Sequence, residues 1–185
     1  MTQAHQCHPP APHRSSMIIF TGDGRGKTSA AVGMAVRAAG HGLKAFIVFF
    51  MKGKMYVHGE MLALDAFPGI EYRSFGQEGW VEKSRPVAGY REQALLGLAA
   101  AREAMLSGRH ELVVMDEING AVEHGLLTED EVIATVAARP EEVGLILTGR
   151  NASPRLVDMA DTVTEMRCVK HAFDSGTAAC RGIDY

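Results

Sequence analysis

From Met17 onward, short apolar runs alternate with longer stretches of helical periodicity. Several of the runs are apolar at consecutive positions, which is typical of strands covered on both faces, as in a parallel sheet. The expected strands are Met17–Phe20, Ala45–Met51, Ile70–Phe75, Leu112–Met115, Val143–Leu147 and Thr162–Val169. Repeated β–α alternation predicts a three-layer α/β fold with a mostly parallel sheet.

Helices are expected between these strands. The segment Lys27–Ala39 is almost uniformly small and apolar, and Thr128 stands three residues before Glu131, which is the spacing of a capping box. Ser153 before Pro154 predicts another helix start, with proline at the first helical position. A further helix is indicated by an apolar stripe at helical spacing, made of Ala94, Leu95, Leu98, Ala101 and Met105.

Length and composition indicate one globular domain. The chain has 185 residues, of which 46% are hydrophobic and 22% are charged, and domains commonly hold ~100–200 residues. Residues 1–16 are polar, rich in proline and without periodicity, so we expect a flexible arm there. The expected domain spans residues 17–185.

Charge, cysteines and hydropathy exclude several classes of protein. The net charge is −3 and no block of five like charges occurs, so a nucleic-acid partner is not expected. The three cysteines are far apart and form no C-x-x-C pair, which favours a reducing cytoplasm. The longest wholly apolar run, Ala45–Met51, is too short to cross a membrane.

The strongest local motif is Thr21–Thr28, a glycine-rich loop between the first strand and the first helix. Its glycines allow successive N–H groups to converge on phosphate oxygens, Lys27 adds a mobile charge, and Thr28 offers a hydroxyl to Mg²⁺. Thr21 stands where the P-loop pattern has its first glycine. The expected nucleotide contacts in the loop are Gly22, Asp23, Gly24, Arg25, Gly26, Lys27, Thr28 and Ser29.

Acidic residues end a later apolar strand. Asp116 and Glu117 follow Leu112–Met115 directly, and the carboxyl ends of strands are where open α/β sheets bind ligands. Together with Thr28 they are expected to hold Mg²⁺ or Mn²⁺ beside ATP, although an acidic residue there could also cap the next helix. Arg150 follows another strand and is expected to hold triphosphate oxygens, with a solvated loop arginine as the alternative.

The chain from about Met17 to Tyr185 resembles the corrinoid adenosyltransferase family of the BtuR/CobO/CobP type. Any one of the matching segments could arise by chance, but the series in family order and spacing is highly specific. The matching segments are residues 20–31, 37–42, 52–53, 59–60, 116–119, 148–152, 160–166 and 169–176.

This resemblance implies a P-loop enzyme in which ATP lies reversed and exposes its 5′ carbon to a Co(I) corrinoid, so that triphosphate leaves as a unit. Lys27 and Thr28 are then the catalytic loop residues, and Glu117 becomes a metal ligand instead of a hydrolytic base. The reaction belongs to adenosylcobalamin synthesis or salvage. The resemblance also implies a homodimer, and a reductase such as a flavodoxin or flavoprotein that supplies the electron.

The resemblance is weaker where the family contacts the corrinoid. The family usually has Gly-x-Gly-Phe-x-Trp after its third strand, whereas this chain has Gly76–Val81, with one aromatic residue, Trp80. Phe49 and Cys180 each replace a common glutamine. Phe75 and Trp80 are the candidates for the corrinoid-facing wall, with core packing as the alternative for both.

Two other classes of function compete with the adenosyltransferase. A P-loop phosphotransferase or NTPase would release ADP or phosphate and have little affinity for corrinoids. A non-catalytic carrier would bind a corrinoid or a nucleotide without releasing triphosphate. The identity of the phosphate product separates the three hypotheses.

Overall fold

The computed structural model describes residues 15–53, 58–76, 88–172, 176 and 178–183. Its strands are β1 (Met17–Thr21), β2 (Ala45–Phe50), β3 (Ile70–Phe75), β4 (Leu112–Asp116), β5 (Gly144–Thr148) and β6 (Thr162–Glu165). They form a six-stranded sheet in the order β3-β2-β4-β5-β1-β6, in which every neighbouring pair is parallel. The predicted parallel α/β architecture is confirmed.

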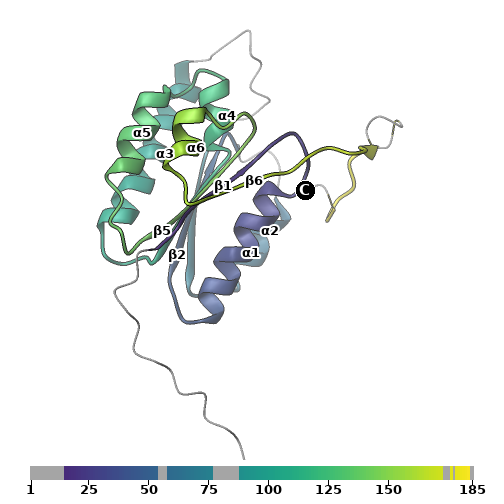
Figure 1. Ribbon diagram of the computed structural model, residues 1–185. Coiled ribbons are helices and arrows are strands. Elements are labelled where there is room, and N and C mark those ends of the chain that lie inside the picture. Colours follow the sequence, from purple (N-terminus) through teal and green to yellow (C-terminus); the bar gives the residue numbers. More distant parts are fainter. Residues whose placement is uncertain (1–14, 54–57, 77–87, 173–175, 177, 184–185) are drawn as a thin grey trace, which may run out of the picture.

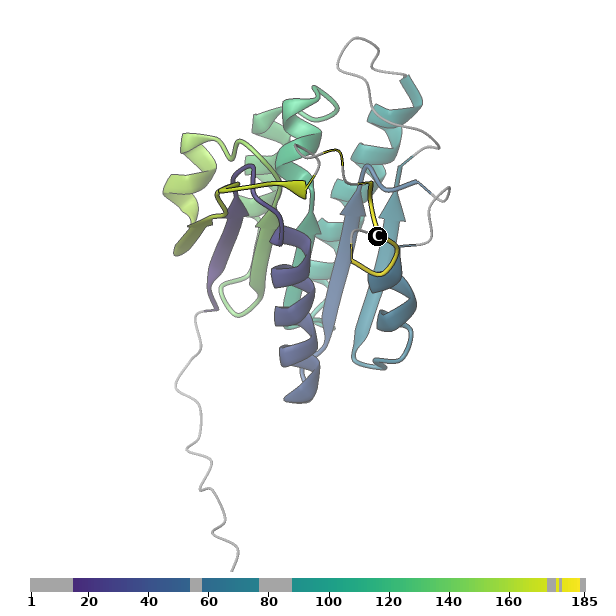
Figure 2. The ribbon, with the colours of Figure 1, turned by 90° about the vertical axis from the view of Figure 1, so that its right-hand side faces the viewer.

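Helices cover both faces of this sheet (Figure 1). The helices are α1 (Lys27–Gly40), α2 (Gly59–Leu64), α3 (Ala88–Leu106), α4 (Ile118–Glu123), α5 (Glu129–Ala137) and α6 (Pro154–Met159). Helices α1 and α2 lie on one face, and α3, α4, α5 and α6 lie on the other. Figure 2 shows the strands pointing toward one edge of the sheet, which is also where β1 passes through a loop into α1.

Each face of the sheet has its own apolar core. Ala31 and Ala35 of α1 pack with Ile47 and Phe49 on one side. On the other side a larger cluster joins α3, α5 and the opposite faces of the same strands. All positions of β2 and β5 are buried, because helices cover both of their faces, which explains why these strands are apolar at consecutive positions.

The predicted helix starts are confirmed. Thr128 Oγ1 accepts a hydrogen bond from the Glu131 N–H at 3.2 Å, and Glu131 Oε2 accepts one from the Thr128 N–H at 2.7 Å, which completes the capping box. Ser153 Oγ accepts from the Leu156 N–H at 3.3 Å, with Pro154 at the first helical position. These bonds satisfy N–H groups that a helix leaves without partners.

The sixth strand is shorter than expected, and two helices were missed. β6 ends at Glu165 instead of Val169, because its partner strand β1 ends at Thr21 and the chain continues there into the glycine-rich loop, whose Gly24 N–H donates to the Met166 carbonyl. Helices α2 and α4 have six residues each, which is too few for helical periodicity to show. None of the described helices is long and apolar enough to span a membrane.

Candidate nucleotide-binding site

The loop between β1 and α1 is shaped by glycines and by a close backbone neighbour. Gly22 and Gly26 have φ of +96° and +107°, values that other residues rarely adopt. A Cβ at Gly22 would collide with the Met166 carbonyl oxygen, and one at Gly24 would lie 2.7 Å from the same atom. The Gly24 N–H donates to that oxygen at 2.7 Å. The loop therefore needs glycine for conformation and for contact.

Thr21 shows why the first glycine of the usual pattern is dispensable here. It is still part of β1 and has extended backbone, so no positive φ is required at this position. Its Oγ1 accepts a hydrogen bond from the Ala152 N–H at 3.1 Å, which ties the start of the loop to the segment after β5. Threonine at this position of the P-loop pattern therefore adds a hydrogen bond to Ala152 that glycine could not make.

Lys27 is the first residue of α1 and is 7% exposed. Its Nζ donates to the carbonyl oxygens of Gly22 at 2.8 Å and Gly24 at 2.7 Å. Burial lowers the pKa of Lys27, and the carboxylate of Glu117 acts against that shift. The ammonium is thereby held inside the loop, where it can be redirected to a phosphate oxygen.

A hydrogen-bonded chain joins the loop to the ends of two central strands. Asp116 ends β4 and is 1% exposed. Its Oδ2 accepts from Thr28 Oγ1 at 3.2 Å, and its Oδ1 accepts from Thr148 Oγ1 at 2.7 Å. Thr148 Oγ1 in turn accepts from the Glu117 N–H at 2.8 Å. One buried threonine therefore positions both acidic residues, a role that depends on the pairing of β4 with β5.

Glu117 occupies a strained position between β4 and α4. Its φ is +61°, which is uncommon for a residue with a side chain. Burial raises the pKa of Glu117, the neighbouring Asp116 raises it further, and Lys27 opposes both. Backbone strain and a shifted pKa at one half-buried residue are typical of functional sites.

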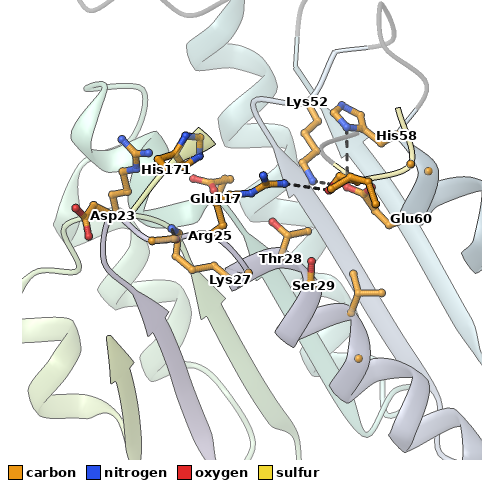
Figure 3. A pocket seen from close by; sticks show the side chains of 18 residues that line it. Asp23, Arg25, Lys27, Thr28, Ser29, Lys52, His58, Glu60, Glu117 and His171 are labelled. Carbon is orange, nitrogen blue, oxygen red and sulfur yellow. Dashed lines mark hydrogen bonds and ion pairs between the residues drawn. The ribbon is translucent and has the colours of Figure 1, made fainter. Parts of the chain in front are cut away.

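These residues surround one cavity of about 660 Å³, a size suited to a small ligand. The predicted residues Asp23, Arg25, Ser29 and Arg150 line it together with Lys27, Thr28 and Glu117 (Figure 3). The buried Asp116 is connected to them by the hydrogen bond that it accepts from Thr28.

Two of the lining residues connect the loop to the C-terminal part of the chain. Asp23 Oδ1 accepts from the Cys168 N–H at 3.1 Å, and this bond lowers the pKa of Asp23. Arg25 Nη2 donates to the Ile183 carbonyl at 3.0 Å, and Ile183 itself lines the cavity. The C-terminal segment therefore forms part of the cavity wall.

The cavity has a second charged side that the sequence analysis did not assign. Lys52, after β2, pairs with Glu60 of α2 at 2.8 Å and with Asp116 Oδ2 at 3.1 Å. His58 Nδ1 lies 3.9 Å from Glu60 Oε1. Lys52 follows a buried parallel strand just as Asp116 ends one, so the convergence of strand ends at one edge could have identified it.

The two predicted aromatic residues are placed differently. Phe75 ends β3 and packs against the core on the α3 side, where Gly97 leaves room for it: a Cβ on Gly97 would lie 3.2 Å from the Phe75 ring. Phe75 is not among the residues that line the 660 Å³ cavity. Trp80 lies outside the described residues.

The donor set of the site fits Mg²⁺ that arrives with a nucleotide. The Thr28 hydroxyl and the carboxylates of Asp116 and Glu117 are the hard oxygen donors that Mg²⁺ prefers, and this ion normally takes its other ligands from phosphate and water. In the described part of the chain, no group of three or more His, Cys, Asp or Glu residues is placed to hold a metal by itself.

Comparisons with known proteins match nearly the whole chain. The sequence model of the family described as ATP:corrinoid adenosyltransferase BtuR/CobO/CobP matches residues 13–185. The chain is 38% identical over 177 residues to the corrinoid adenosyltransferase of Pseudomonas aeruginosa, covering 93% of this chain and 84% of that protein. It is 38% identical over 174 residues to corrinoid adenosyltransferase CobA of Salmonella typhimurium, covering 93% and 86%.

Proposed function

The chain belongs to the ATP:corrinoid adenosyltransferase family BtuR/CobO/CobP, and on this basis we propose that it transfers the 5′-deoxyadenosyl group of ATP to the Co(I) centre of a corrinoid and releases triphosphate. The observation that supports the ATP half of the proposal is the single cavity that brings together Lys27, Thr28 and Glu117. A phosphate loop beside acidic strand ends is the arrangement that binds a metal–nucleotide complex.

In the proposed reaction Co(I) provides an electron pair that forms a bond to C5′ of ATP. The bond between C5′ and its oxygen breaks, the electron pair leaves with the triphosphate, and the cobalt becomes formally Co(III). Lys27 and the loop N–H groups stabilise the negative charge on the leaving group, which is electrostatic catalysis by groups already in place. Mg²⁺, when held by Thr28, Asp116 and Glu117, would offset further charge on the polyphosphate.

This reaction needs no side chain that removes a proton, because the nucleophile is a metal centre instead of water. Glu117 therefore serves as a metal ligand in the proposed mechanism. Thr148 positions that residue by accepting the Glu117 N–H while it donates to Asp116. These hydrogen bonds, with the one from Thr28 to Asp116, hold both carboxylates in a fixed position relative to the loop.

The corrinoid side of the proposal rests on the family resemblance. Phe75 and Trp80 are proposed to face the corrinoid, and an apolar wall there would favour removal of the lower axial ligand before reduction. Trp80→Ala should then reduce turnover of Co(II) corrinoid with an enzymatic reductant by ten- to a thousandfold. Most activity should return when Co(I) is generated chemically, and equal defects under both conditions would remove Trp80 from this role.

The setting of the reaction is also part of the proposal. A flavodoxin or flavoprotein reductase supplies the electron, the enzyme works in the cytoplasm, and it acts as a homodimer. Size-exclusion chromatography with light scattering tests the dimer, and reduction of enzyme-bound Co(II) corrinoid by purified flavodoxin tests the electron donor.

The identity of the phosphate product tests the reaction itself. Protein is incubated with MgATP and chemically reduced corrinoid, and the products are identified by phosphorus NMR. Tripolyphosphate in amounts equal to the alkylated corrinoid is expected. Stoichiometric ADP would favour a phosphotransferase or NTPase, and binding of both ligands without any phosphate product would favour a carrier.

A further inference from the structure

Lys52 is held in place from two directions. Its carbonyl oxygen accepts a hydrogen bond from Ser74 Oγ at 2.5 Å. Gly76 approaches its backbone so closely that a Cβ there would lie 2.7 Å from the Lys52 carbonyl carbon. Ser74 and Gly76, at the end of β3, therefore fix the backbone of Lys52. This fixed backbone determines where the Lys52 side chain leaves the carboxyl edge of the sheet.

The side chain of Lys52 is 15% exposed and carries its charge among two carboxylates and an aromatic ring. Nζ lies 2.8 Å from Glu60 Oε1, 3.1 Å from Asp116 Oδ2 and 4.6 Å from the centre of the Phe49 ring. Two carboxylate oxygens and the face of an aromatic ring are surroundings that suit a charged ammonium group.

This cation stands next to the phosphate loop. Asp116 Oδ2, which contacts Lys52, also accepts from Thr28 Oγ1, so one oxygen atom joins the two residues. Lys27 and Lys52 line the same cavity, and Figure 3 shows Thr28 between them, with Lys52 on the side of Glu60. Lys27 is directed at loop carbonyls, whereas Lys52 is directed at carboxylates.

An ammonium group has three N–H donors, and Glu60 and Asp116 use two of those of Lys52. The remaining donor can serve a ligand in the cavity without breaking either contact. A polyphosphate chain is the ligand class that fits, because it is strongly anionic and the phosphate loop borders the same space.

We propose that Lys52, oriented by Glu60, is a second polyphosphate-binding residue, which contacts the phosphate chain of the nucleotide from the side opposite Lys27. This inference rests on the proposed use of ATP and extends it to a residue in the loop that follows β2. Lys27 and Lys52 then hold the phosphate chain from two sides, so that triphosphate can leave as one unit. Its negative charge is offset both by the phosphate loop and by the segment that follows β2.

The test is direct binding, without any corrinoid. Isothermal titration calorimetry measures the affinity of the whole protein for tripolyphosphate in EDTA and for MgATP. Lys52→Met should weaken metal-free tripolyphosphate binding about 10- to 100-fold, and Lys52→Arg should recover most of the loss. Lys44→Met, at the opposite end of β2, is the matched control for lost charge and should change the affinity less than about twofold.

The other outcomes are equally informative. If Lys52 only neutralises Asp116 and Glu60, the loss in Lys52→Met comes from the carboxylates left unpaired, and combining Lys52→Met with Asp116→Asn and Glu60→Gln restores the wild-type affinity for tripolyphosphate in EDTA. That result overturns the inference while the proposed function stands. If the wild-type protein binds neither MgATP nor tripolyphosphate, both are overturned. Should Lys52→Met fail to fold, Lys52→Gln keeps a donor toward the carboxylates but lacks the charge, and is expected to show the same loss of affinity.

Discussion

The two edges of the parallel sheet use polar groups in opposite ways. At the amino edge, where the strands begin, the backbone groups of neighbouring loops form hydrogen bonds with one another. The Glu111 N–H donates to the Lys44 carbonyl at 2.9 Å, and the Gly144 N–H donates to the Glu111 carbonyl at 2.8 Å. At the carboxyl edge, charged side chains face a cavity, and Asp116 joins residues from three segments.

Backbone strain follows the same division. Among the described residues, the non-glycine residues with positive φ are Met51, Glu117 and Asn151, and each follows a strand at the carboxyl edge. Such conformations cost about 1–3 kcal/mol each and persist where the surroundings determine them. The amino edge makes its tight turns with Gly42 and Gly108, which adopt positive φ easily. The strained residues and the charged cavity therefore lie at the same edge of the sheet.

The sharpest test of this division compares two lysines. Lys27→Ala removes the mobile cation of the phosphate loop and should lower kcat/KM by about 10²- to 10³-fold or more, measured with MgATP and Co(I) corrinoid. Lys44→Ala removes an exposed cation at the amino edge and should leave kcat/KM within about twofold. Near-normal turnover of Lys27→Ala at saturating ATP would contradict the assignment of the loop.

Two glycines test whether the loop conformation itself is required. Gly22→Ala places a methyl group against the Met166 carbonyl at a φ of +96°, and should lower the free energy of unfolding by about 2 kcal/mol and abolish ATP binding. Gly40→Ala, at the end of α1, meets open space and should raise stability by about 0.5 kcal/mol. Urea denaturation and ATP titration measure both effects, and equal stability changes would show that the loop is not constrained.

Glu117→Gln should separate stability from function. Because burial and Asp116 raise its pKa, the folded protein binds more protons than the unfolded chain between the ordinary and the raised values. Stability is therefore lost as pH rises through that window. At neutral pH, the free energy of unfolding of Glu117→Gln, measured by urea denaturation, should be higher by roughly 1 kcal/mol. The same variant should bind Mg²⁺ with ATP more weakly.

A second glutamate provides the control for this prediction. The pKa of Glu131 is lowered, first by the Thr128 N–H and then by Arg91, so its contribution to stability is present above its ordinary pKa and lost on acidification. Glu131→Gln should destabilise the protein at neutral pH and leave nucleotide binding intact. If both variants change stability in the same direction, burial does not dominate at Glu117.

Most of the sheet was predictable, because strands such as β2 and β5 are apolar at consecutive positions and lie between glycine-rich or polar turns. The capping box at Thr128, the N-cap at Ser153 and the glycine-rich turn between β1 and α1 were predictable for a similar reason, because each depends on residues that lie close together in sequence. The end of β6 was not, because it depends on long-range pairing with β1, which ends at Thr21.

The carboxyl edge was predictable only in part. Asp116 ends β4 and Arg150 follows β5, so the tendency of parallel sheets to bind ligands at the carboxyl ends of their strands indicated both residues. Lys52 obeys the same rule, but its partner Glu60 lies on a helix too short to show periodicity, so their pairing needs the three-dimensional arrangement. The role of Thr148 as a bridge between Asp116 and Glu117 likewise depends on strand order, which brings β4 beside β5.

The smallest expected effect concerns His110 at the amino edge. Its side chain is buried against Phe46, with ring centres 5.3 Å apart, and its two nitrogens have no hydrogen-bond partner among the described residues. Nε2 lies 3.6 Å from Glu71 Oε1. His110→Phe keeps a ring and removes buried polar atoms, so the free energy of unfolding should rise by about 1 kcal/mol. Because His110 is not among the residues that line the cavity, kcat/KM should stay within about twofold, and a large loss of activity in a stable variant would show that the two edges do not divide their roles.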